Sequence, residues 1–450
     1  MKIINLRYII FISLLLCLIA FNPVIKTIII STCLALCLGK NLERSLMAFS
    51  ITQMFFILNG KIFGFITPLD TLLRILIFIL PFFLILVRTY KLCLKNKIFL
   101  FNSFFSLWLL ISNLLINNNS LITLSLLKII LYYSGSSYII LAFGKLKTLS
   151  NFISWFIAIG INFILFSLFI YIFSFDQGIF GHQNLFHGAF VHPNQVGITL
   201  IPFLIFFANE FNNVKKNNLF LAIIVTIFFL VFLSGARGSV VSLFLCVTIC
   251  ILISFFKKSF FSQLKNIFNK NKLLIIFSII FLLLFFSSIE LLFREFLLKG
   301  EYEDSNSTEL FYQSRGWRIL LSLENFYQNP YLGIGFGVPT IIENVRIKYD
   351  PIFNFPISAP VEKSFFFSGI LEEMGIIGFF VFFIFYFKWS KIIIKNVGSI
   401  FMLAIFISIF TLSIFEFQFF SMGIYGFNWL WLGLITSLAL NKRLNVNPLI

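Results

Sequence analysis

Charged residues are scarce in this sequence. Only 11% of its 450 residues are charged, and 60% are hydrophobic, whereas about a quarter of the residues in a typical soluble domain are charged. The mean hydropathy of +1.01 excludes an ordinary water-soluble protein. We therefore expect a protein that crosses a membrane many times.

Histidine and cysteine are also rare. The chain has three histidines, at positions 182, 187 and 192, and six cysteines, nearly all of them inside apolar runs. Neither residue type shows the spacing of a metal site, so we expect no metal and no cofactor. The net charge of +17 does not indicate a nucleic-acid partner, because the basic residues lie in short scattered clusters.

Long apolar runs fill most of the chain. About 20 apolar residues cross a hydrocarbon core of about 30 Å. Candidate runs lie near 8–23, 27–39, 45–59, 72–87, 98–116, 121–143, 149–173, 195–210, 218–234, 239–256, 273–292, 366–387, 398–415 and 424–440. The sequence therefore predicts an all-α polytopic membrane protein with about 12–14 transmembrane helices.

Basic residues gather in alternate turns between these runs, which is typical of cytoplasmic turns. Clusters of Lys and Arg occur at 88–97, 257–272 and 442–443, whereas the turn at 176–192 has none. This bias predicts that both termini are cytoplasmic.

Acidic residues concentrate in one polar segment. Nine of the 17 acidic residues lie between Arg294 and Lys363, on the side predicted to be outside the cytoplasmic membrane. We expect about 11 transmembrane helices in residues 1–292, a long periplasmic loop with short helices at 293–365, and further transmembrane helices at 366–450.

A predicted external turn ends in His192-Pro193-Asn194. Pro and Asn are common where a helix begins, so this turn can be interpreted as a helix cap. In the other interpretation, His192 and Asn194 contact a polar substrate at the membrane surface.

A second external turn reads Ser234-Gly235-Ala236-Arg237-Gly238-Ser239. The guanidinium of Arg237 suits bidentate binding of a phosphate or pyrophosphate, and Ser234 and Ser239 offer hydroxyl groups. Glycines beside an arginine also permit close approach of the backbone. The alternative is that Arg237 only extends to the membrane interface.

The polar segment contains two further candidates. Residues 316–327 read as an amphipathic helix, and Arg315, Arg318 and Ser322 share one face of it because they are spaced i, i+3 and i+7. Glu362 precedes the apolar run at 366–387, so it is either a helix cap favoured by the helix dipole or a general base.

Together these segments resemble the O-antigen polymerase and O-antigen ligase superfamily of bacterial membrane glycosyltransferases. The resemblance rests on the order and spacing of His192 to Asn194, Ser234 to Ser239, Ser314 to Arg318, Asn329 to Gly337, and Leu371 to Gly378. It covers roughly residues 180 to 385, and the N-terminal third matches only as hydrophobic spans.

The resemblance implies a metal-independent, inverting transfer of a glycan from a polyprenyl-pyrophosphate carrier to an acceptor hydroxyl. Arg237 and Arg315 would hold the pyrophosphate, with support from Arg318, and Glu362 would act as the base. The implied partners are the polyprenyl-linked oligosaccharide and membrane lipid, and a chain-length regulator protein is a further candidate.

Three functions stay open at this point. Ligase-like members place a His-Asn pair where this chain has Glu362-Lys363-Ser364, and no histidine follows His192. This departure favours an O-antigen or capsular polysaccharide polymerase over a ligase acting on lipid A core. A lipid-linked oligosaccharide flippase is disfavoured, because we expect few ionisable residues in the spans, namely Lys128 and, near the ends, Glu290 and Glu416.

Overall fold

The computed structural model describes residues 4–65, 67–93, 95–116, 121–146, 148–173, 179–180, 185–213, 218–270, 316–341, 348–349, 356–358, 363, 365–416, 419–420 and 426–440. Helices make up nearly all of this part of the chain. Within it, strands occur only as two antiparallel pairs of two or three residues each. Helices suit a chain in lipid because every backbone group bonds within its own segment.

The first half of the chain forms eight helices and a strand pair. They are α1 (Leu6–Phe21), α2 (Pro23–Cys37), α3 (Leu42–Ile57), α4 (Gly60–Phe63), α5 (Pro68–Cys93), α6 (Lys97–Leu115), α7 (Ile122–Lys145), α8 (Ser150–Phe173), β1 (Ile179–Phe180) and β2 (Leu185–Phe186). Helix α3 is buried along almost its whole length. It therefore lies inside the bundle, with other helices around it.

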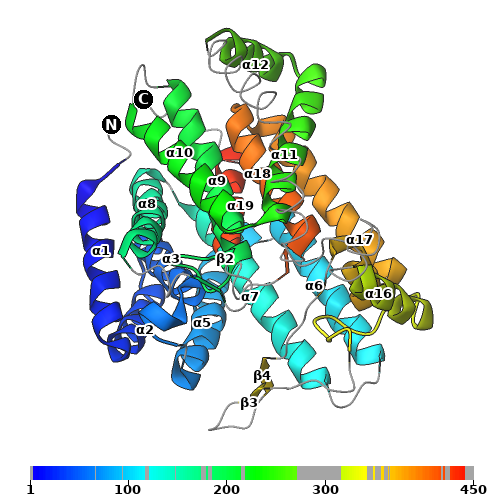
Figure 1. Cartoon of the computed structure of the whole chain (residues 1–450). Coiled ribbons are helices and arrows are strands. Elements are labelled where there is room, and N and C mark those ends of the chain that lie inside the picture. The colour runs from blue at the N-terminus through cyan, green and yellow to red at the C-terminus, as the bar shows by residue number, and fades with distance from the viewer. Residues whose placement is uncertain are drawn as a thin grey trace, which may run out of the picture.

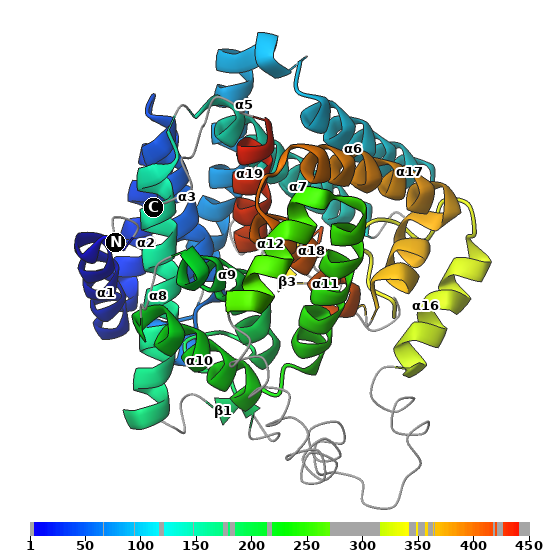
Figure 2. The same ribbon diagram turned by 90° about the horizontal axis from the view of Figure 1, so that it is seen from above.

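The second half contributes the remaining helices and a second strand pair. They are α9 (Pro193–Asn213), α10 (Asn218–Leu233), α11 (Arg237–Phe256), α12 (Lys258–Lys270), α16 (Trp317–Gln328), β3 (Lys348–Tyr349), β4 (Pro356–Ser358), α17 (Phe366–Asn396), α18 (Ile400–Glu416) and α19 (Gly426–Leu440). Figure 1 shows α12 and the start of α1 at one end of the bundle and the β3–β4 pair at the other. Helices α1 and α16 lie on opposite flanks (Figure 2).

Asparagine side chains begin several of the helices. Asn5, Asn22, Asn41, Asn59 and Asn96 each precede a helix and accept a hydrogen bond from an N–H of its first turn. This is the usual N-cap arrangement, in which a side-chain oxygen satisfies a backbone donor that has no partner in the helix. The polar turns therefore fix where the apolar helices start.

Within the described residues, seven helices are long and apolar enough to cross a membrane, and five more apolar helices are shorter. The seven are α5, α6, α7, α8, α9, α11 and α17, and the five are α1, α2, α10, α18 and α19. Each span expected from the sequence coincides with a helix, except that at 273–292, which lies outside the described residues. The prediction of an all-α polytopic membrane protein is confirmed.

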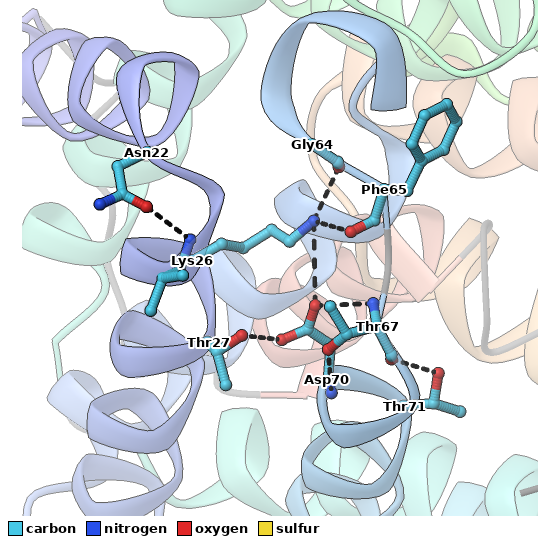
Figure 3. A network of polar contacts seen from close by, with 9 residues as sticks. Asn22, Lys26, Thr27, Gly64, Phe65, Thr67, Asp70 and Thr71 are labelled. Atoms are coloured by element: carbon cyan, nitrogen blue, oxygen red, sulfur yellow. Dashed lines mark hydrogen bonds and ion pairs between the residues drawn. The ribbon is translucent and has the colours of Figure 1, made fainter. Parts of the chain in front are cut away.

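A buried ion pair fixes the end of the bundle at which α2 and α5 begin (Figure 3). The Lys26 ammonium donates to the carbonyls of Gly64 and Phe65, both at 2.8 Å, and lies 3.9 Å from the Asp70 carboxylate. The Thr27 hydroxyl donates to Asp70 at 2.6 Å. Because both charges have several partners, the network is explained as a structural link between α2, α4 and α5.

Candidate functional site

Backbone hydrogen bonds tie the turn before α9 to the end of α3. The N–H of Val191 donates to the carbonyl of Ile57 at 2.9 Å, and the N–H of Asn59 donates to the carbonyl of Ala189 at 2.8 Å. The start of α9 is therefore held against the start of α4 and the end of α3. We call this contact the α3–α9 junction.

His192 and Asn194 lie at the start of α9, directly after this junction. The Asn194 N–H donates to Nδ1 of His192 at 3.2 Å, and the Gln195 N–H donates to the His192 carbonyl at 3.0 Å. Both side chains are half-buried. The geometry is that of a helix N-cap. Both side chains are also partly exposed, so the cap does not exclude a substrate contact.

The turn with Ser234 to Ser239 connects α10 to α11. Gly235 has φ +58°, a conformation that L-residues with a side chain rarely adopt. A Cβ at this position would lie 2.9 Å from the Leu185 side chain in β2. The structure thus brings this turn next to the segment that leads to His192, so two of the predicted groups lie side by side.

The serines of this turn are both buried. The Ser234 hydroxyl donates to the carbonyl of Val231 at 2.7 Å, and the Ser239 side chain lies directly against Gly197 of α9. Arg237 is the first residue of α11. The turn is therefore packed tightly against α9, with the arginine at a helix start.

Helix α16 carries the arginine that was predicted to support pyrophosphate binding. It packs against α17, and its Ser322 is buried whereas Leu320 and Tyr327 are exposed. The Arg318 guanidinium lies 5.1 Å from the ring centroid of Trp317. Because Arg318 is four residues from Ser322, it lies on the side of α16 that borders α17.

Helix α17 is interrupted beside a glycine loop, residues 333–337. Gly375 has φ +63° and ψ −172°, which breaks the helix. The carbonyls of Glu372 and Glu373 accept the N–H groups of Ile334 and Gly335 at 2.7 and 3.2 Å. A break inside a membrane helix is tolerated where protein supplies such partners.

The loop also supplies an acceptor on the other side of the break. The N–H of Ile376 donates to the carbonyl of Pro330 at 2.8 Å. A Cβ on Gly333 would lie 2.5 Å from the Glu372 carbonyl oxygen, and one on Gly375 would overlap the backbone of Tyr331. The two glycines therefore allow the loop and the helix to touch backbone to backbone. We call this contact the loop–helix junction.

Side chains on three elements meet at this junction around Glu372. The Lys363 ammonium lies 2.7 Å from its carboxylate, and both side chains are buried. The Asn325 amide of α16 donates to the Glu372 carboxylate at 2.7 Å and to the Thr340 carbonyl at 2.9 Å. The Thr340 hydroxyl also donates to the Glu372 carboxylate, at 3.3 Å. The polar segment is thus attached to the membrane helix by a fully bonded carboxylate.

Lys128 and Glu373 complete, with this ion pair, a charge cluster of Lys128, Lys363, Glu372 and Glu373. The Lys128 ammonium of α7 donates to the carbonyl of Gly337 at 2.6 Å. The buried Glu373 carboxylate interacts electrostatically with both lysines. The cluster is formally neutral, which lowers the cost of burying four charges together.

Sequence reasoning missed most of this cluster. Glu372 and Glu373 were used there only as part of the motif from Leu371 to Gly378. Lys128 was counted among the ionisable residues of the expected spans, but these two were not, nor were Arg74 and Glu210. Ionisable residues inside apolar runs are the feature that could have found it. The argument against a transporter from scarce intramembrane charge therefore loses its force.

Several predicted residues lie outside the described part of the chain. They are Arg315 and Glu362, together with most of the expected loop at 293–365, of which 316–341 and short pieces near 348, 356 and 363 are described. Among the described residues, no group of three or more His, Cys, Asp or Glu side chains could hold a metal ion.

The apolar helices, with a broken helix that receives a polar segment, define a polytopic helical membrane protein. Residues 222–383 match the family model described as O-antigen ligase. The match contains α16, the glycine loop and the break in α17. The resemblance to the O-antigen ligase and polymerase superfamily seen in the sequence is confirmed over residues 222–383.

The family is one of membrane enzymes similar to glycosyltransferases, which act on lipid-linked oligosaccharides. No curated protein and no solved structure matches the chain.

Proposed function

We propose that this protein is a polysaccharide polymerase of the O-antigen or capsule type. It transfers a glycan from a polyprenyl-pyrophosphate carrier to the terminal hydroxyl of an acceptor repeat unit at the outer face of the cytoplasmic membrane. The observation that carries the proposal is the family match over residues 222–383, in a chain that has no histidine after His192.

The proposed reaction is a single displacement with inversion at the anomeric carbon. The acceptor hydroxyl oxygen attacks that carbon, the bond to the pyrophosphate oxygen breaks, and the pyrophosphate leaves with the electron pair. A base takes the hydroxyl proton. Stabilising the charge that develops on the leaving group is worth several kcal/mol in a site shielded from water.

The arginines fit the leaving group by their chemistry. Arg237 and Arg315 are assigned to the pyrophosphate, with Arg318 beside them, since guanidinium groups bind phosphate oxygens bidentately. The position of Arg237 at the first residue of α11 supports this role, because a helix N-terminus favours an anion. His192, Asn194, Ser234 and Ser239 are assigned to the substrate around this turn.

Glu362 is assigned as the base. Its neighbour Lys363 is held in the charge cluster by the ion pair with Glu372. A carboxylate at this point would otherwise serve as a helix cap.

A ligase is the second candidate, because the matching family model is described as O-antigen ligase. A ligase attaches finished glycan to a different acceptor, whereas a polymerase uses the lipid-linked repeat unit as both donor and acceptor. The absence of a histidine from the sequence after His192 favours the polymerase.

The two candidates differ in what accumulates when the protein is lost. Deletion of a polymerase leaves a single repeat unit on the surface lipid, whereas deletion of a ligase leaves lipid-linked polymer that is not attached. Purified protein supplied only with lipid-linked repeat units should give carrier-linked chains of increasing length. A deletion strain with unattached polymer, together with no elongation in vitro, would refute the polymerase.

A further inference from the structure

Gln53 has an amide group without a partner in the bundle interior. Its side chain is 1% exposed, and neither its nitrogen nor its oxygen has a hydrogen bond. By contrast, the buried amide of Asn102 is bonded to Ser136, Ser137 and Tyr132. A buried polar group without a partner is costly and requires an explanation such as a bound molecule.

Gln195 has a second amide oxygen without a hydrogen bond, near the α3–α9 junction. Its side chain is 2% exposed, and Oε1 has no hydrogen bond. Gln53 lies one helical turn before Ile57, and Gln195 lies four residues after Val191, the two residues bonded at the α3–α9 junction. Helices α3 and α9 both pack against α8 and α19, so the two amides lie at a similar depth from the junction.

Two features adjoin the Gln53 amide, a glycine of α19 and a cation next to the following turn of α3. Gly426 begins α19, and any side chain at this position would collide with the Gln53 amide oxygen. On the same face of α3, three residues further on, the centroid of the Phe56 ring lies 3.8 Å from the guanidinium carbon of the half-buried Arg74. An aromatic ring, a cation and an amide are thus gathered at one end of the bundle, beside the segment that leads to His192.

The unpartnered atoms indicate which ligand fits. The oxygens of Gln53 and Gln195 need hydrogen-bond donors, and the nitrogen of Gln53 needs an acceptor. An ionised pyrophosphate has acceptors only, whereas each sugar hydroxyl donates and accepts. We propose that Gln53 and Gln195 form a subsite that binds hydroxyl groups of the glycan, on the substrate assigned under the proposed function.

Binding of two ligands to the protein in lipid nanodiscs tests this subsite. The first is the lipid-linked repeat unit purified from the strain that makes the protein, and the second is the same polyprenyl pyrophosphate without sugar. Gln53→Met should raise the Kd of the first about tenfold, equivalent to about 1.4 kcal/mol, and leave that of the second unchanged. Gln195→Met should act in the same direction.

Gln263→Met is the matched control. The Gln263 amide of α12 donates to the Gly398 carbonyl at 2.7 Å and accepts from the Ile400 N–H at 3.0 Å. Its loss should lower the melting temperature without changing either Kd. Gln53→Met should not lower the melting temperature of the ligand-free protein, because no protein hydrogen bond is lost and an unpartnered buried amide is removed.

Three results would overturn the subsite: equal weakening of both ligands by Gln53→Met, no change in either Kd, or a fall in melting temperature without a change in Kd. The first would indicate a phosphate site, the second a buried water and the third a structural amide. The proposed function fails by a different result, namely wild-type protein that binds the repeat unit but does not join units.

Discussion

The Glu372 carboxylate shows how a single residue joins three elements. It receives the Lys363 ammonium, the Asn325 amide and the Thr340 hydroxyl, all within 3.3 Å. These donors come from the start of α17, from α16 and from the segment after the glycine loop. If one of these three donors is removed, the Glu372 carboxylate stays buried with fewer partners.

Lys363→Met should destabilise the protein by about 3–5 kcal/mol, the usual cost when one partner of a buried ion pair is removed. Glu372→Met should cost a similar amount. The double variant should be more stable than either single variant, because no uncompensated charge from this pair then remains. Chemical denaturation of the purified protein measures all three, and additive losses in the double variant would show that the two groups do not interact.

Arg237→Ala and Glu362→Gln should each abolish chain elongation while the protein still inserts into the membrane. The first removes the proposed leaving-group ligand, and the second removes the proposed base while keeping the size of the side chain. Elongation of lipid-linked repeat units by purified variants is the measurement. Normal polymer from both variants would show that the catalytic assignment is wrong.

At the scale of elements, the loop–helix junction depends on glycine. Gly333 has φ +76°, and its Cα faces the Glu372 carbonyl so closely that a Cβ would lie 2.5 Å from the oxygen. Gly333→Ala should therefore destabilise the protein by at least about 1–3 kcal/mol and reduce elongation, because the loop can no longer dock at the break.

Gly398→Ala is the matched control for this change. Gly398 connects α17 to α18, and a Cβ there would meet nothing within 4 Å. Its carbonyl, which accepts from Gln263, is unaffected by the substitution. Equal melting temperatures of the Gly333 and Gly398 variants would contradict the close contact at the junction.

The helices could be predicted from the sequence because lipid demands long apolar runs, and runs such as 149–173 coincide almost completely with a helix, here α8. The loop–helix junction could not be predicted from the sequence. Gly333 and Gly375 are separated by more than 40 residues, and no spacing rule connects a loop to a helix break. The amphipathic helix at 316–327 was predicted correctly as α16, but its contact with Glu372 through Asn325 depends on tertiary packing.

At the scale of the whole molecule, the basic helix α12 and the described strands of the polar segment lie at opposite ends of the bundle (Figure 1). Figure 1 shows α12, which begins in the basic cluster at 257–272, at the end opposite to the β3–β4 pair. The Lys257 ammonium there donates to the carbonyls of Ile394 and Val397 at 2.8 and 3.1 Å, so α12 is anchored to the connection between α17 and α18. This separation agrees with the proposed orientation, in which α12 is cytoplasmic.

Cysteine labelling of intact cells tests that orientation. Five of the six native cysteines are buried and only Cys17 is exposed, so a Cys17→Ser background should react weakly. In that background we expect Tyr327→Cys, whose native side chain is 74% exposed on α16, to react with a membrane-impermeant maleimide. Ser262→Cys, at an exposed position of α12, should react only after the cells are opened. The reverse labelling would place α16 in the cytoplasm, where a polymerase acting at the outer face of the membrane could not use it.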